Sequence, residues 1–178
     1  MVGGAAWGPS ADVPVLLAGE VHLWFAIGEP DSGLTALRFL LGEYLGRRPQ
    51  SFRIEQAGDR LLVPGFPIAC GMSESSGARL LGFTPRGHLG VALERLRSDI
   101  PYSARGLTQE ALSRVRLQPP QRRNEAAVWE CCRQRALRQA CPSAVLLPVP
   151  PIPGFAAAVA VDRLRALRTF QYAPNGLR

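Results

Sequence analysis

Residues 77–97 constrain the fold more than any other part of the chain, because they predict two strands and the turn between them. Residues 78–84 form an apolar run that a single Arg interrupts, residues 85–87 supply the reversal, and residues 88–96 are apolar again up to Glu94. A rigid strand fixes where the oxygens of a terminal carboxylate point, so this position suits a divalent cation. We therefore expect a hairpin here, with Glu94 either as a metal ligand or as the acid of a solvated ion pair with the arginines that follow it, Arg95 and Arg97.

The charged residues limit the chemistry that the chain can perform. Its net charge is +7, its pI is near 10.2, and all 21 of its Lys and Arg residues are Arg. Without Lys there is no Schiff-base lysine, no Walker-type phosphate lysine and no lysine general base. We attribute the Arg-only usage to genome composition. A basic surface still favours anionic partners, such as phosphorylated cofactors or an acidic protein.

The cysteines and the apolar tracts bear on the compartment. The four Cys form no C-x-x-C pair, and the two His do not complete a zinc-site spacing, which favours reduced thiols in a cytoplasmic protein. The first residues lack the basic and apolar regions of a signal peptide. Four prolines interrupt the most apolar tract, residues 144–161, which rules out a membrane helix there. We expect a cytoplasmic protein with no membrane partner.

The pattern of apolar residues predicts an α+β protein. Residues 1–14, rich in Gly, Ala and Pro, are expected to be a disordered leader, and residues 73–77 a polar loop. Beyond the hairpin, seven further segments read as strands: residues 20–27, 51–56, 61–63, 68–72, 143–147, 154–161 and 167–172. Helices are predicted from Asp31 or Ser32 to Leu45, over residues 107–115, where Thr108 opens the helix, and over residues 122–140.

These elements divide the chain into two halves of similar composition. Residues 15–100 and residues 101–178 each combine strands with one principal helix, and a connector at residues 100–106 joins them. At 178 residues the chain is long enough to bury a sizeable core. No sequence repeat is evident. The order of elements nevertheless predicts two similar α+β halves.

Six short motifs occur in a fixed order along residues 20–172. Arg38 precedes paired leucines in the first helix, residues 58–60 read Gly-Asp-Arg, residues 71–75 read Gly-Met-Ser-Glu-Ser, and residues 90–94 read Gly-Val-Ala-Leu-Glu. A helix marked by Trp129 and a Pro-Gly-Phe strand follow. This order resembles the Sfp type of the 4′-phosphopantetheinyl transferase superfamily. That family has Gly-Lys-Pro, Asn-x-Ser-His-Ser, Gly-Val-Asp-x-Glu, Trp-x-x-Lys-Glu-Ala and a Pro-Gly-Tyr strand at these places.

The chain departs from the family motifs at most of the charged positions. Ala92 stands where the family has the first acid of Gly-Val-Asp-x-Glu, and the serine loop has lost its Asn and His. The Lys and Glu of the tryptophan helix fall on Cys132 and Arg133, or on Arg133 and Gln134 if one residue is inserted. Glu94 is the one acid that the chain keeps cleanly.

The resemblance implies a fold and a reaction. The fold would be a pseudo-twofold pair of α/β halves, and the reaction would transfer phosphopantetheine from coenzyme A to a serine of an acyl or peptidyl carrier protein, with Mg²⁺ between the halves. It implies a metal-binding and catalytic role for Glu94, with Arg133 and Gln134 at the other catalytic positions. Coenzyme A would be bound by four residues: Arg38, Ser73, Glu74 and Ser75.

The substitutions lead us to expect that this transfer is weakened or lost. Mg²⁺ prefers oxygen ligands, Ala92 has none, and an Arg stays protonated and cannot act as a base. Losing one charge-stabilising contact costs about 3–4 kcal/mol in barrier height. The alternative is a non-catalytic protein that binds a carrier protein or another acidic partner through the basic helix. We expect no nucleic-acid partner, since neither a stacking strand nor a helix-turn-helix pattern is present.

Overall fold

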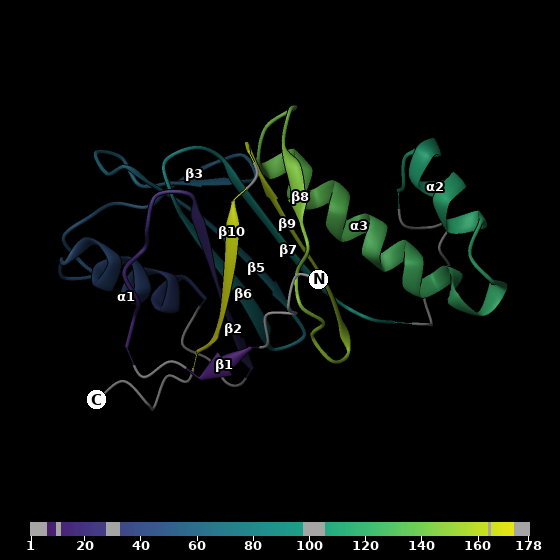
Figure 1. Ribbon diagram of the computed structural model, residues 1–178, viewed down its shortest axis with the longest axis horizontal. Coiled ribbons are helices and arrows are strands. Elements are labelled where there is room, and N and C mark those ends of the chain that lie inside the picture. The colour runs from purple at the N-terminus through teal and green to yellow at the C-terminus, as the bar shows by residue number, and fades with distance from the viewer. Residues whose placement is uncertain (1–6, 10–11, 28–32, 98–105, 164, 173–178) are drawn as a thin grey trace.

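The computed structural model describes residues 7–9, 12–27, 33–97, 106–163 and 165–172, which form two β-sheets with helices packed against them (Figure 1). The large sheet has the strand order β1 (Gly8–Pro9), β10 (Ala166–Gln171), β2 (Glu20–Ile27), β6 (Ala78–Pro85), β5 (Ile68–Ser75), β4 (Arg60–Leu62) and β3 (Glu55–Ala57). The small sheet has the order β7 (Leu89–Arg95), β9 (Phe155–Val161) and β8 (Val145–Leu147). The α+β composition expected from the sequence is confirmed.

Three α-helices and one 3₁₀ turn complete the described part of the chain. They are α1 (Gly33–Leu45), α2 (Gln109–Arg116), the 3₁₀ turn η2 (Pro120–Arg122) and α3 (Arg123–Gln139). Thr108 caps α2 by accepting a hydrogen bond from the Ala111 amide, as its predicted position requires. Among the described residues, no helix has the length and apolar character that crossing a bilayer demands.

The elements stack in four layers, because the central strands bury side chains on both faces. Trp24 of β2 packs with α1, whereas Leu23 on the opposite face of the same strand packs with Val91 and Val159 of the small sheet. The far face of the small sheet carries Ala92 and other small residues and packs against α3. Alternation with a period of two residues therefore places the large sheet between α1 and the small sheet.

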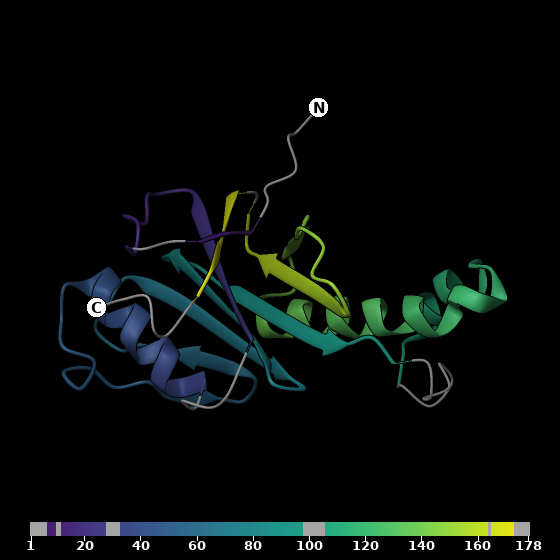
Figure 2. The ribbon, with the colours of Figure 1, turned by 90° about the horizontal axis from the view of Figure 1, so that it is seen from below.

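The close packing of α3 on the small sheet depends on small side chains. Ala92 and Ala158 are register partners on β7 and β9, and they contact Cys132 and Ala136 of α3 in one buried cluster. A Cβ on Gly90 would overlap the Ala136 carbonyl oxygen, so this position requires glycine. Figure 2 shows α3 running along β7 and β9 and continuing beyond them.

The predicted hairpin of residues 78–96 is wrong, although both of its strands exist. β6 pairs with β2 on one edge and with β5 on the other, so no edge remains for β7. The chain instead crosses to the small sheet, where β7 pairs with β9. Arg86 and Gly87 make this crossing in the left-handed region, with φ of 56° and 91°.

Other boundaries differ from the sequence-based expectations. β5 extends to Ser75, so residues 73–75 of the predicted loop lie in a strand. The strand predicted over residues 51–56 is shorter and later than expected, because only Glu55–Ala57 forms a strand there. Gly8–Pro9 lies within the expected leader, yet it forms β1 parallel to β10, which corrects that expectation for these residues. Three predicted features lie wholly or partly outside the described residues: the helix caps at residues 31–32, residues 100–105 of the connector, and residues 1–6 and 10–11 of the leader.

A buried polar network joins β2 to α1. His22 is fully buried; its Nδ1 lies 2.9 Å from the Tyr44 hydroxyl, and its Nε2 lies 3.1 Å from Glu20 Oε2. Because the Glu20 carboxylate only accepts, the neutral ring carries its proton on Nε2, and Nδ1 accepts from the Tyr44 hydroxyl. The Trp24 indole donates to the same Tyr44 oxygen at 2.8 Å. Burial lowers the pKa of His22, even though Glu20 opposes that change.

This network predicts that the folded chain loses stability as the pH falls through 6.5. The ordinary pKa of His22 is 6.5, and below this pH the His22 side chain is protonated in the unfolded chain but not in the folded chain. The free energy of unfolding therefore falls by up to about 1.4 kcal/mol per pH unit. Urea unfolding between pH 7.5 and 5.0 measures this slope. His22→Gln should flatten it, and an unchanged slope in that variant would contradict the assignment.

Candidate functional site

The edge of β7 that faces away from β9 is held by side chains instead of a neighbouring strand. The amides of Leu93 and Arg95 donate to the hydroxyls of Ser73 and Ser75 at 2.9 Å each, and the Val91 amide donates to Gln139 Oε1 at 2.8 Å. These three alternate amides all point away from β9. An edge strand left without such partners would bury unsatisfied donors. We call this set of contacts the β7 seam.

Two paired glycines let the sheets approach at the β7 seam. Gly71 of β5 and Gly82 of β6 are register partners. A Cβ on Gly71 would lie 2.9 Å from Val91 Cγ2, and one on Gly82 would lie 2.7 Å from the same atom. Both distances are shorter than a carbon–carbon contact allows, so the pair makes room for Val91.

The structure brings Ser73 and Ser75, which the resemblance assigned to coenzyme A, to this seam. Ser73 is buried, and besides accepting from Leu93 its hydroxyl lies 3.4 Å from the Leu93 carbonyl oxygen, to which it donates. Its hydrogen-bonding capacity is therefore used within the protein. The Ser75 hydroxyl lies nearer to solvent and accepts from the exposed Arg95.

Glu74 lies between these serines in sequence and points to the other face of the large sheet, where it pairs with Arg79. Arg79 Nε donates to Glu74 Oε1 at 2.8 Å, and the two residues are register partners on β5 and β6. The same carboxylate lies against Gly33, the first residue of α1, where a Cβ would overlap it. A carboxylate here complements the helix dipole, and it repels an approaching phosphate.

Arg38, the remaining coenzyme A candidate, is bonded to the backbone that follows α1. Its Nη1 donates to the carbonyl oxygens of Phe52 at 3.1 Å and Pro49 at 3.3 Å. The side chain is partly buried. These bonds fix the loop between α1 and β3, and they account for the Arg without a ligand.

Glu94 lies on the face of β7 that packs on α3, where it meets Arg135. Arg135 Nη2 is 3.7 Å from Glu94 Oε2, and the side chains are 42% and 29% exposed. A pair this exposed adds little to stability. No sequence pattern predicts this pair, because it depends on how the helix packs on the end of the strand.

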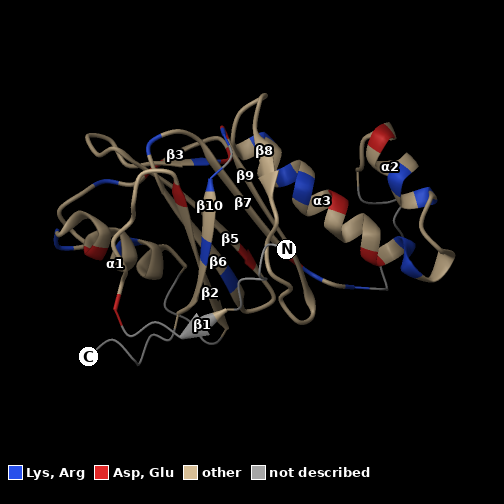
Figure 3. Cartoon of the chain, in the orientation of Figure 1, with Lys and Arg blue, Asp and Glu red and all other residues tan. Residues whose placement is uncertain are grey.

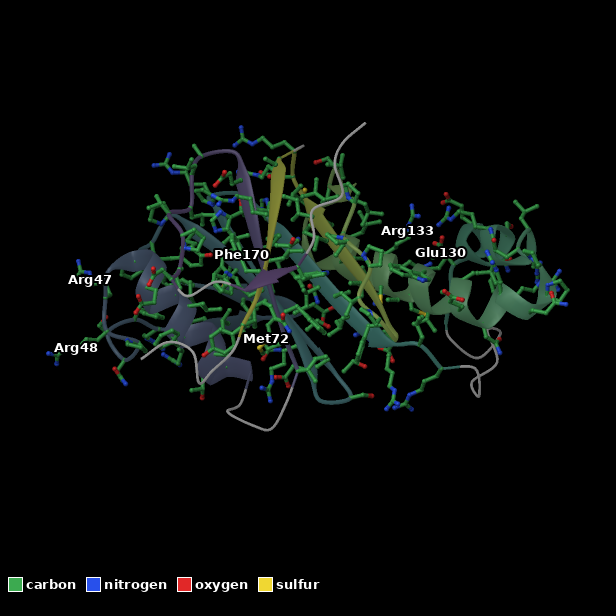
Figure 4. The ribbon with its side chains drawn as sticks, turned by 60° about the horizontal axis from the view of Figure 1, so that its bottom comes forward. Arg47, Arg48, Met72, Glu130, Arg133 and Phe170 are labelled. Atoms are coloured by element: carbon green, nitrogen blue, oxygen red, sulfur yellow. The ribbon has the colours of Figure 1, made fainter. Side chains whose placement is uncertain are left out.

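Three neighbouring residues of α3 point in three directions. Cys132, at the family's Lys position in one alignment, is buried and donates from Sγ to the Ala156 carbonyl oxygen at 3.4 Å. Gln134 donates from Nε2 to Thr108 Oγ1 at 2.9 Å and so ties α3 to the start of α2. Arg133 is exposed and points away from α3 (Figure 4). Among the described residues, neither Arg133 nor Gln134 forms a hydrogen bond or an ion pair with Glu94.

The side chains around Glu94 do not fit Mg²⁺. The described residues contain no group of three His, Cys, Asp or Glu side chains that could hold a metal ion. Ala92 places a buried methyl group where a carboxylate would be needed, and the nearest charged partner of Glu94 is the Arg135 cation. A divalent cation prefers several oxygen ligands and is repelled by a guanidinium group.

α2 and the adjoining part of α3 form a helical arm that extends away from the sheets (Figures 1 and 2). The main contacts of α2 are with α3. Arg114 binds the buried Glu130 through two hydrogen bonds, from Nε at 3.0 Å and from Nη2 at 2.8 Å. Bonding to Glu130, assisted by Glu110, raises the pKa of Arg114. This bidentate pair locks the two helices together.

The arm carries hollows on both sides of Trp129. The first, of about 380 Å³, is lined by Arg122 and Glu125, and the second, of about 420 Å³, is lined by Leu117, Arg133 and the Arg114–Glu130 pair. Gln118, Ala126 and Trp129 line both hollows. Leu117 is 83% exposed. Within the described chain, no ion pair is recorded for Arg122 or Arg133. Figure 3 shows that basic residues recur along both helices of the arm.

Comparison of the chain with known protein families and with curated proteins finds no match.

The β7 seam predicts unequal effects of the two serines on stability. Ser73→Ala leaves the buried Leu93 amide without a partner and should cost about 1–3 kcal/mol, whereas Ser75→Ala should cost less than about 1 kcal/mol because water reaches the Arg95 amide. Urea unfolding followed by circular dichroism measures both. If Ser73 served only a ligand, its removal would leave the unfolding midpoint unchanged.

Proposed function

We propose that this chain is a phosphopantetheinyl-transferase-like protein whose transfer activity is weakened or lost, and that it binds an acidic carrier protein through the helical arm. The combination of the two hollows at Trp129 with Arg122 and Arg133 on their walls is the observation that carries the binding proposal. The ancestral cofactors would be coenzyme A and Mg²⁺. The proposed location is the cytoplasm, in keeping with a sequence whose four cysteines form no C-x-x-C pair.

The topology supports a pseudo-twofold relation between the halves. In the first half α1 precedes the antiparallel pair β5 and β6, and the next strand, β7, crosses to the other sheet. In the second half α3 precedes the antiparallel pair β8 and β9, and the next strand, β10, crosses to the large sheet. Each half thus donates its last strand to the sheet of the other. We propose that this exchange reflects the paired halves of the transferase fold.

The charge of the arm supports an acidic partner. Residues 107–140 contain seven Arg and three Glu, and Glu110 and Glu130 are already bound to Arg114. Tryptophan and arginine are the side chains most often found at the energetic centre of protein interfaces. A partner with acidic residues around an apolar contact would complement Trp129, Leu117 and the arginines.

The proposal predicts that transfer is slow and that a carboxylate at position 92 raises it. Incubated with coenzyme A, Mg²⁺ and an apo carrier protein, the chain should add phosphopantetheine at least about 100-fold more slowly than an active transferase, because charge-stabilising contacts are missing. Intact mass spectrometry of the carrier measures the addition. Ala92→Asp should increase the rate, provided that circular dichroism shows it folded.

The double variant Ala92→Asp/Glu94→Gln is the matched control for this experiment. It removes the second carboxylate of the restored pair, so the gain should disappear. Transfer by the unmodified chain at the rate of an active transferase would contradict the loss of activity. A folded Ala92→Asp protein with no gain would contradict the argument that the missing acid limits transfer.

Binding to the carrier protein is predicted to depend on Arg133. Arg133→Glu should weaken binding at least about tenfold and reduce its dependence on salt, since it reverses one charge of the arm. Calorimetric titration at 50 mM and 200 mM NaCl measures both effects. Arg47→Glu is the control, because Arg47 is also exposed but lies at the opposite end of the molecule (Figure 4).

Equal weakening by both substitutions would indicate attraction by net charge alone and would contradict a specific site on the arm. The second candidate function, binding of a different acidic protein, rests on the same arm. This second function would be favoured if the chain bound no carrier protein but captured another acidic protein in a way that depends on Arg133.

A further inference from the structure

A second concave site lies apart from the helical arm and from Glu94. It is a pocket of about 410 Å³ between β4, the start of β5, the crossing from β6 to β7, and the end of α3. Its apolar lining includes Leu61, Val63, Phe66 and Leu89. The whole lining comes from residues 60–70, residues 87–89 and Gln139, and Gln139 also belongs to the β7 seam. None of them takes part in the function proposed above.

The polar lining of this pocket favours an anion. Three of the residues that line it have polar side chains: Arg60 carries a guanidinium group, His88 an imidazole and Gln139 an amide. The Gln139 oxygen is bonded to the Val91 amide, so its NH₂ group is the part that remains as a donor. None of the described residues that line the pocket carries a carboxylate.

The remaining functional group in the pocket is the thiol of Cys70, which is 2% exposed. Burial raises the pKa of Cys70 to about 12, so the thiol stays uncharged and does not repel an anion. The lining is thus apolar with two basic groups and one donor amide. A ligand with an unbranched apolar chain and a single anionic head matches both features.

We propose that this pocket binds a small amphipathic anion, with its head group bonded to Arg60 and its apolar chain against Phe66 and Leu89. A carboxylate or a phosphate monoester would supply the head group, since a guanidinium group bonds either in the same geometry. The proposal is independent of carrier-protein binding, because the two sites share no lining residue.

Octanoate, octyl phosphate and octan-1-ol are the probes. At least one of the two anions should bind with a dissociation constant of about 1 mM or lower, as expected for about ten heavy atoms. The neutral alcohol should bind at least about tenfold more weakly, since it lacks the charge that Arg60 recognises. Calorimetry gives the affinities, and the tighter of the two anions identifies the head group. Amide shifts in a ¹H–¹⁵N correlation spectrum should be largest at residues 60–66 and 87–89.

Arg60→Gln should raise the dissociation constant of the anion about tenfold or more. Arg53→Gln is the matched control, because Arg53 is an exposed arginine close in sequence that does not line the pocket. His88→Gln should weaken binding without unfolding the chain, since His88 is exposed. The proposal is overturned by no binding of either anion, by equal affinity for octan-1-ol, by equal effects of Arg60→Gln and Arg53→Gln, or by shifts confined to other residues.

Discussion

The fold depends on how one strand is attached at its free edge. β7 pairs with β9 on one side, and on the other side its alternate amides are taken by Ser73, Ser75 and Gln139. A side-chain hydroxyl can satisfy a backbone amide without bringing a second strand into register. The two sheets can therefore meet face to face across Val91 while the β7 edge remains satisfied. The position of the small sheet and of α3 follows from this attachment.

The residues that the resemblance assigned to a ligand site have structural partners, at the β7 seam and elsewhere. Ser73 bonds to Leu93, Arg38 to Phe52 and Pro49, and Glu74 to Arg79. Each of these side chains is polar, and the resemblance assigned each to coenzyme A. In this chain their hydrogen bonds are made within the protein. Glu94 is paired with the Arg135 cation, whereas a metal ion would require further acidic ligands beside it.

Much of the secondary structure could be predicted from the sequence, because the local patterns are strong. The strand at 20–27, the helix ending at Leu45 and the helix capped by Thr108 are confirmed. The pairing of β6 and β7 could not be predicted, since two adjacent apolar strands joined by a Pro/Gly turn read as a hairpin. The hairpin does not form because β2 and β5 occupy the two edges of β6. These pairings join distant parts of the sequence, so local patterns do not reveal them.

The candidate site was predictable as a set of positions and not as a geometry. The order of motifs pointed to Glu94 and to the tryptophan helix, but residues 132–134 of a helix face three different ways, and only packing shows which way each one faces. The pocket beside Arg60 and His88 had no sequence signal at all. Its walls come from three separate parts of the sequence, residues 60–70, residues 87–89 and Gln139, which only the folded chain brings together.

The arginines that line the hollows at Trp129 have a consequence for regulation. A guanidinium group keeps its proton throughout the physiological pH range, and it is not a substrate for lysine acetylation. With no lysine anywhere in the sequence, the arm cannot be discharged by acid–base change or by that modification. A partner bound to the helical arm must therefore be released by salt, by a competing ligand, or by a change in the charge of the partner itself.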